Sequence, residues 1–137
     1  MSIHSATTQH LYALIPSAGT GARAGSSEPK QYRSIAGIPM VIHTLRAFGA
    51  VSRIKRGLVV VAPNDNFILG LLEKYEISQF HVAQVGGAQR SDTVLAGLNT
   101  LLAQGAKSDD WVLVHDAARC LITPQQIEDL IDVVVHD

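Results

Sequence analysis

Short apolar runs alternate with amphipathic stretches along most of the chain. The runs, rich in aliphatic and β-branched residues, predict buried strands over 11–15, 57–62, 80–85 and 111–115. Apolar residues at three- and four-residue spacing predict helices over 39–48, 67–75, about 91–102 and 124–134. Strands that alternate with helices in this way predict an α/β fold with a mainly parallel sheet, helices on its faces and right-handed crossovers.

Capping and breaking residues refine these boundaries. Residues 37–39 predict a turn, and Pro39 suits the first turn of the first helix, which Gly49 could end. Ser91 or Asp92 is expected to cap the third helix. The basic segment 53–56 is expected to be a solvated turn before the second strand. Residues 1–10 are polar and aperiodic, which predicts a flexible extension ahead of a domain over 11–137.

The segment after the first strand carries the strongest candidate chemistry. Its residues 17–21, Ser-Ala-Gly-Thr-Gly, have almost no side chain, so backbone N–H groups there can approach a phosphate closely. Arg23 and Lys30 follow, and a guanidinium can bridge two phosphate oxygens. A strand, a loop of small residues and two cations together predict a polyphosphate site.

Other interpretations of this segment compete with that one. A glycine cluster can be a surface turn with no ligand. Gly19, Gly21 and Ala24 fit a dinucleotide-binding fingerprint, but residues 25–29 do not favour the helix that this motif requires. A Walker A loop is excluded because no Gly-Lys-Ser/Thr follows. A loop that wraps a nucleoside triphosphate in a nucleotidyltransferase fits the residues better than these.

Two further polar turns follow predicted strands. Gly86 and Gly87 come after the third strand, and Asp116 closes the fourth. The carboxyl ends of parallel strands share one edge of a sheet, and ligands bind there in open α/β folds. The glycine loop, the Gly86-Gly87 pair and Asp116 are therefore expected to converge on one site.

Three motifs in this order resemble the IspD family of 2-C-methyl-D-erythritol 4-phosphate cytidylyltransferases. They are P-S-A-G-T-G-A-R at 16–23 with P-K-Q-Y at 29–32, G-G-A-Q-R-S-D-T-V-L-A-G-L at 86–98, and V-L-V-H-D-A-A-R at 112–119. The resemblance covers nearly all of the chain from about Leu11. It departs at Cys120, where the family usually has proline. It implies a three-layer α/β/α Rossmann-like nucleotidyltransferase fold, expected to be incomplete here because family members are longer.

The resemblance also assigns roles to residues. It implies that Arg23 and Lys30 are catalytic and stabilise the charge that develops at the α-phosphorus. Thr93 would bond the cytosine ring, with backbone at Ala18 and Gly87 completing recognition of the base. The remaining residues predicted to bind the nucleotide by backbone or loop contacts are Pro16, Ser17, Thr20, Gly21 and Gly86.

Near the ribose the resemblance places Gly19 and Ala117. Asp116 would hold Mg²⁺, directly or through water, or bond the ribose, since magnesium prefers oxygen ligands and substrate phosphates. Arg90 contacts the nucleotide or anchors its own loop.

The implied reaction transfers CMP from CTP to 2-C-methyl-D-erythritol 4-phosphate and releases pyrophosphate. Two alternatives stay open. The acceptor could be another polyol phosphate such as ribitol 5-phosphate, or the chain could be a truncated fragment that binds CTP without turnover. The resemblance further implies a homodimer for the full-length family member.

Length and composition agree with one ordinary globular domain. The 137 residues are 47% hydrophobic, enough for a core, and the net charge of -1 argues against a general nucleic-acid binder. One cysteine excludes an internal disulfide framework and fits a reducing cytoplasm. No apolar run approaches the roughly 18 residues of a membrane span, so no membrane partner is expected.

Overall fold

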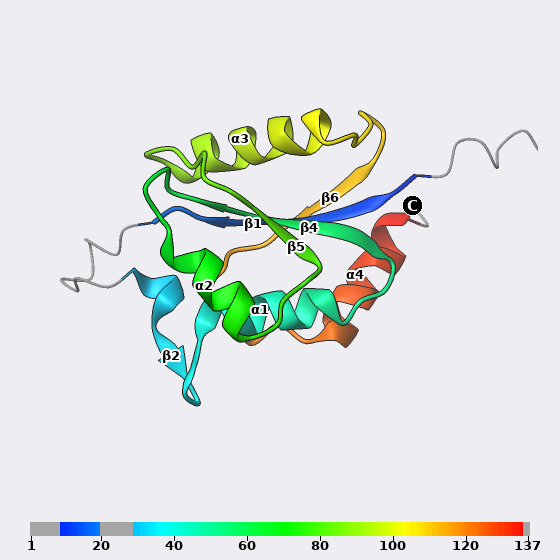
Figure 1. The fold of residues 1–137 in the computed structure, drawn as a ribbon. Helices are drawn as coiled ribbons and strands as arrows, with labels where there is room; N and C mark the ends of the chain where they lie inside the picture. Colours follow the sequence, from blue (N-terminus) through cyan, green and yellow to red (C-terminus); the bar gives the residue numbers. More distant parts are fainter. Residues whose placement is uncertain (1–8, 20–28, 136–137) are drawn as a thin grey trace, which may run out of the picture.

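Four parallel strands form the central sheet of the computed structural model, which describes residues 9–19 and 29–135. The strands lie in the order β5 (Phe80–Ala83), β4 (Ile54–Val61), β1 (Leu11–Ser17) and β6 (Trp111–Val114) (Figure 1). The chain therefore builds outward from β1 to β5 on one side and then returns to add β6 on the other. The order reverses between β1 and β6, and such a switch point is where open α/β sheets bind ligands.

Helices cover both faces of the sheet, which confirms the predicted three-layer α/β/α architecture (Figure 1). One face carries α1 (Met40–Gly49), α2 (Phe67–Lys74) and α4 (Pro124–Val135), and the larger apolar core lies beneath them. The other face carries α3 (Arg90–Ala103) alone, over a smaller core. Gly97 lets α3 lie close to the sheet, because a Cβ there would be 2.6 Å from Leu14 Cδ1.

The strand boundaries differ from the predictions at several ends. β1 continues through Pro16 and Ser17, which were expected in the loop, because both pair with β4. The proline is tolerated since β6 pairs with β1 only as far as Leu14, so this end of β1 resembles an edge. β5 ends at Ala83 and β6 at Val114, each earlier than predicted.

The basic segment 53–56 is not a solvated turn, because β4 begins at Ile54. Ile54 pairs with Leu11 of β1, so the strand starts three residues earlier than predicted. The guanidinium of Arg56 lies over the ring of the β1 residue Tyr12, 5.6 Å from its centroid. A cation–π contact of this kind lets a basic residue occupy a strand, which an apolar pattern does not reveal.

A small hairpin was not predicted. β2 (Ser34–Ile35) and β3 (Ile38–Pro39) pair as antiparallel strands just before α1. The turn of this hairpin lies at Ala36 and Gly37, which both have positive φ values. It comes earlier than the predicted turn over 37–39, because Ile38 and Pro39 form β3. Pro39 is the N-cap of α1 rather than its first residue, and Gly49 belongs to that helix, which Ala50 caps.

The capping prediction for α3 was also wrong by two or three residues. The helix begins at Arg90 with Gln89 as its N-cap. Asp92 acts from the third helical position instead, where its carboxylate accepts the Gln89 N–H at 3.2 Å. Gly105 follows the last turn with a φ of 110°, as expected of a residue that ends a helix.

Most of the predicted N-terminal extension lies outside the described residues. His10, at its end, is bonded to the start of β6: its N–H donates to Asp110 Oδ1 at 2.9 Å, and its carbonyl accepts the Trp111 N–H. Asp110 also accepts the Lys107 N–H, and these two hydrogen bonds lower the pKa of its carboxyl. His10 therefore belongs with the sheet edge. No helix in the described residues is long and apolar enough to cross a bilayer.

Candidate active site

A cavity of about 250 Å³ opens at the switch point between the carboxyl ends of β1 and β6. We call it the switch-point cavity. It brings together the end of β1, the loop before α3, the first turns of α3 and the loop after β6. The predicted site residues that line it are Pro16, Ser17, Ala18, Gly19, Gly87, Arg90, Thr93, Asp116 and Ala117. Four residues that were not predicted also line it, namely Gln31, Ala88, Gln89 and Ala118.

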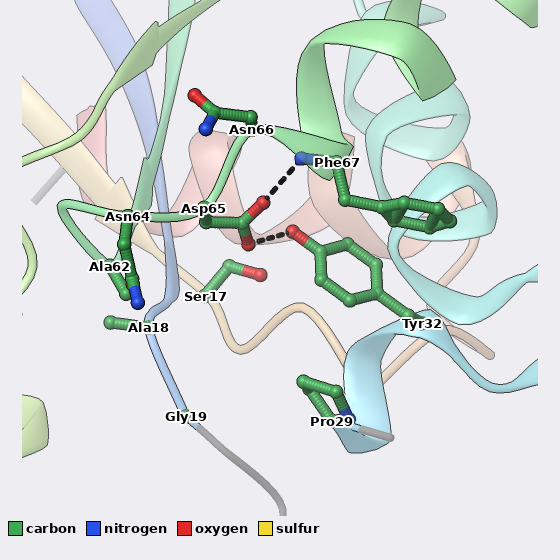
Figure 2. Close-up of a pocket in the computed structure, with 10 residues that line it drawn as sticks. All are labelled: Ser17, Ala18, Gly19, Pro29, Tyr32, Ala62, Asn64, Asp65, Asn66 and Phe67. Carbon is green, nitrogen blue, oxygen red and sulfur yellow. Dashed lines mark hydrogen bonds between the residues drawn. The ribbon is translucent and has the colours of Figure 1, made fainter. Parts of the chain in front are cut away.

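The wall that β1 contributes is mostly backbone. The Gln31 side chain is buried, and its amide donates to the carbonyl oxygens of Ser17 at 3.0 Å and Gly19 at 3.1 Å. These bonds fix the backbone where the strand passes into the small-residue loop. The Ser17 hydroxyl is buried and has no hydrogen-bond partner among the described residues. A buried hydroxyl without a partner is costly. This one points toward the β4 side of the strand, where Tyr32 and Asp65 lie (Figure 2).

A tight turn after β5 forms the opposite wall. The Gly87 N–H donates to the Thr93 hydroxyl at 3.1 Å, and that hydroxyl lies 3.2 Å from the Gln89 carbonyl. Gly86 itself does not line the cavity. Its N–H donates to the Val61 carbonyl, and a Cβ there would be 2.5 Å from Ala18 Cβ. Glycine at this position therefore lets the turn approach the β1 loop.

Asp116 lies between two arginines at the rim. Arg90 Nε is 2.8 Å from Asp116 Oδ1, and Arg119 Nε is 3.3 Å from Oδ2. The groups are accessible to water, with Arg90 59% and Asp116 36% exposed. Ala117 beside them is fixed from below, since the buried Thr44 hydroxyl donates to its carbonyl at 2.7 Å. Exposed ion pairs of this kind contribute little stability and can exchange for a ligand's charges.

Lys30 lines a neighbouring cavity of about 720 Å³ rather than the switch-point cavity. This second cavity also contains Arg119 and Cys120, and it meets the first at Ala118. Cys120 is buried. The described residues thus place two cations, Lys30 and Arg119, around a single hollow next to Asp116. Thr20, Gly21 and Arg23 lie outside the described residues, so their predicted roles stay predictions.

A third cavity, of about 530 Å³, lies on the other side of β1, toward β4 and α2 (Figure 2). We call it the β4-side cavity. At its centre the Tyr32 hydroxyl donates to Asp65, and the Tyr32 ring meets Phe67 edge-on at 5.0 Å. Burial first, and then the hydrogen bond and charge of Asp65, raise the pKa of Tyr32 well above its ordinary value. Figure 2 shows the Ser17 side chain directed toward this pair.

The comparisons with known proteins agree on one family. The model of the family described as IspD, 2-C-methyl-D-erythritol 4-phosphate cytidylyltransferase, matches residues 11–136. The chain belongs to the IspD family. The resemblance predicted from the three motifs is thereby confirmed, and so is the fold that it implied.

Relatives within the IspD family are close in sequence. The bifunctional enzyme IspD/IspF of Albidiferax ferrireducens is 58% identical over 133 residues, which cover 97% of this chain and 31% of that protein. The 2-C-methyl-D-erythritol 4-phosphate cytidylyltransferase of Paraburkholderia phytofirmans is 48% identical over 130 residues, 95% of this chain and 54% of that protein. The chain therefore spans about half, or less, of the length of these relatives.

Solved structures of IspD proteins share the fold. A crystal structure of 4-diphosphocytidyl-2C-methyl-D-erythritol synthase matches with a TM-score of 0.78 and 34% identity, over 91% of this chain and 54% of that one. The Francisella tularensis 2-C-methyl-D-erythritol 4-phosphate cytidylyltransferase matches with a TM-score of 0.71 and 29% identity, over 94% of this chain and 54% of that one.

Sequence reasoning missed four polar residues around these cavities. Gln31, Tyr32 and Arg119 lie inside quoted motifs but were given no role, and Asp65 was not predicted to belong to the site. Tyr32 and Asp65 are 33 residues apart, and only the fold brings them together. The one local signal for Gln31 and Tyr32 is their position directly after the Pro-Lys pair of the first motif.

Proposed function

We propose that the protein transfers CMP from CTP to 2-C-methyl-D-erythritol 4-phosphate, giving 4-diphosphocytidyl-2-C-methyl-D-erythritol and pyrophosphate. Membership of the IspD family supports this reaction, as do the activities for which its relatives are named. The observation that carries it is the switch-point cavity, where three sequence motifs far apart in the chain meet at the expected edge of the sheet. Nucleotidyl transfer depends mainly on positioning and charge neutralisation, and this cavity offers both.

The two walls of the cavity would hold the nucleoside. The base would bond the backbone at Ala18 and Gly87 and the hydroxyl of Thr93. That hydroxyl already accepts the Gly87 N–H and donates its proton to the Gln89 carbonyl, so it would offer the base its second lone pair. Gly19 and Ala117 would lie near the ribose, where the absence of larger side chains leaves room.

Cations would hold the phosphates. Arg23 and Lys30 are proposed to stabilise the negative charge that builds up as an acceptor oxygen attacks the α-phosphorus and pyrophosphate leaves. Arg119 lines the same hollow as Lys30, next to the switch-point cavity. That arrangement supports entry of the acceptor from this side, with its phosphate oxygens facing the two cations.

Mg²⁺ is the metal we propose. The described residues contain no cluster of three or more His, Cys, Asp or Glu side chains that could hold an ion. They do offer Asp116, and magnesium in nucleotide sites commonly takes one or two carboxylates together with substrate phosphates, so the site fits. When bound, the ion would neutralise phosphate charge. Asp116 would hold it by releasing Arg90 or Arg119, whose contacts are exposed.

Two further expectations belong to the proposal. The resemblance favours a homodimer for family members of full length. The single cysteine fits a reducing cytoplasm, so we expect the reaction to take place there.

Pyrophosphate release from CTP in the presence of Mg²⁺ tests the proposal. Release should require 2-C-methyl-D-erythritol 4-phosphate and should fall on the order of 10²-fold in an Arg23→Ala variant. Arg53→Ala is the matched control, because Arg53 pairs with Glu128 on the surface and lines none of the three cavities. Pyrophosphate release that depends on ribitol 5-phosphate instead would show that ribitol 5-phosphate is the acceptor substrate. CTP binding without release would reduce the function to nucleotide binding.

A further inference from the structure

Lys30, one of the two proposed catalytic cations, lies in an element that has little stability of its own. Lys30 opens η3 (Lys30–Tyr32), a single 3-10 turn, and its own side chain is exposed. The N-cap residue, Pro29, makes no side-chain cap bond. One isolated turn fixes its backbone poorly, since helix nucleation is unfavourable without outside support. The position of Lys30 must therefore depend on what the rest of the turn contacts.

The next two side chains supply that support from two directions. Both are buried, with Gln31 7% and Tyr32 5% exposed. Gln31 donates to the carbonyls of Ser17 and Gly19, at the end of β1. Tyr32 donates to Asp65, in the turn between β4 and α2 (Figure 2). The 3-10 turn is thus tied to the end of β1 and to the turn that follows β4, and these bonds fix the backbone that carries Lys30.

Asp65 is itself immobilised by contacts on every side. Its Oδ1 accepts the N–H groups of Phe67 at 2.9 Å and Ile68 at 3.2 Å, the first residues of α2. Its carbonyl accepts the side-chain amide of Gln84 at 2.7 Å, and its N–H donates to the Ala62 carbonyl. The carboxylate therefore holds a helix end with one oxygen and Tyr32 with the other.

We propose that Tyr32 and Asp65 are positioning residues for Lys30, acting through η3 on the phosphates of the nucleotide. The proposal rests on the function proposed above. The high pKa that burial and Asp65 give Tyr32 keeps the phenol protonated, so it stays a donor at all working pH values. Replacing either side chain would weaken nucleotide binding even though neither side chain contacts the nucleotide.

The test compares CTP with cytidine, which lacks phosphates, in titrations followed by NMR of the whole chain. Tyr32→Phe removes one hydroxyl and keeps the ring against Phe67. We expect this change to weaken CTP binding about three- to tenfold, at most what the free energy of one lost hydrogen bond can transmit to binding, and to leave cytidine binding unchanged. Tyr75→Phe is the matched control, because Tyr75 follows α2 at its far end and lines none of the three cavities.

A second variant separates positioning from general stability. In a Lys30→Ala background, Tyr32→Phe should weaken CTP binding no further, since the residue through which it acts is gone. An equal loss for CTP and cytidine, a loss that persists without Lys30, or no loss at all would overturn the inference while leaving the proposed function standing. If the unmutated chain does not bind CTP more tightly than cytidine, the proposed function and the inference both fail.

Discussion

The two sides of the β1 terminus are built on opposite principles. Toward β6, the switch-point cavity is lined by backbone, small residues and the exposed ion pair of Asp116 with Arg90, which Arg119 joins from the neighbouring cavity. Toward β4, the β4-side cavity is organised by the buried Tyr32 and its bond to Asp65. Both cavities share residues 17–19, so one short stretch of chain faces two unlike environments.

This difference indicates that one side binds the ligand and the other side stabilises the structure around it. Exposed ion pairs can be exchanged for the charges of a substrate at little cost to the fold, because water already screens them. A buried hydrogen bond to a charged group is costly to break and so keeps its geometry. We infer that the nucleotide binds on the β6 side, while the contacts on the β4 side fix the position of Lys30. The predictions below test this division from the largest expected effect to the smallest.

Replacing the exposed carboxylate should damage the reaction far more than the fold. We expect Asp116→Asn to lower acceptor-dependent pyrophosphate release on the order of 10²-fold, because one charge that organises the site is lost. Its effect on the free energy of unfolding should stay below about 1 kcal/mol. Asp129→Asn on α4 serves as the control in both assays. A large loss of stability with unchanged release would reverse the roles we assign to the two sides.

Adding a side chain between the β1 loop and the turn after β5 should lower stability and ligand binding together. Gly86→Ala would put a Cβ 2.5 Å from Ala18 Cβ and 2.8 Å from the Val61 carbonyl oxygen. We expect a loss of about 1–3 kcal/mol in urea unfolding, with weaker CTP binding. Gly70→Ala, in α2 with open space around it, should instead stabilise the chain by up to about 1 kcal/mol. Equal effects of the two substitutions would contradict the packing described here.

High pH should weaken the supporting side first. Unfolded Tyr32 ionises near its ordinary pKa of 10.0, whereas burial and Asp65 keep the folded residue protonated. The unfolded chain therefore binds fewer protons above that pH, so the stability contributed by this group falls as pH rises. Urea midpoints measured from about pH 8 to about pH 11 should drop more steeply for the unmutated chain than for Tyr32→Phe. Identical slopes would show that Tyr32 titrates alike in both states.

Local patterns predicted most of the fold, because each helix and main strand carries its own periodic signal. The failures occur where that signal is short or mixed. The β2–β3 hairpin has two residues per strand, too few for a period to show. Lys55 and Arg56 interrupt the apolar pattern at the start of β4. The Arg56 guanidinium lies over the Tyr12 ring, and this contact lets it occupy the strand.

The site was predictable to the extent that it depends on small residues and strand ends. Gly87, Thr93 and Asp116 meet at the switch point because parallel topology brings strand ends to one edge. The bonds made by Tyr32 and Gln31 were not predictable in the same way. Their partners, Asp65 and the carbonyls of Ser17 and Gly19, are fixed by how η3 docks against the sheet, and no local pattern encodes that docking.

The most direct measurement is the map of backbone amide shifts in the chain as CTP is added. If the β6 side receives the nucleotide, the largest changes should fall on Gly87, Thr93 and Ala117, which line the switch-point cavity. The amides of Asn64 and Phe67, which line only the β4-side cavity, should move little. Changes concentrated on Asn64 and Phe67 would contradict the account, because the nucleotide would then occupy the side that we assign to support.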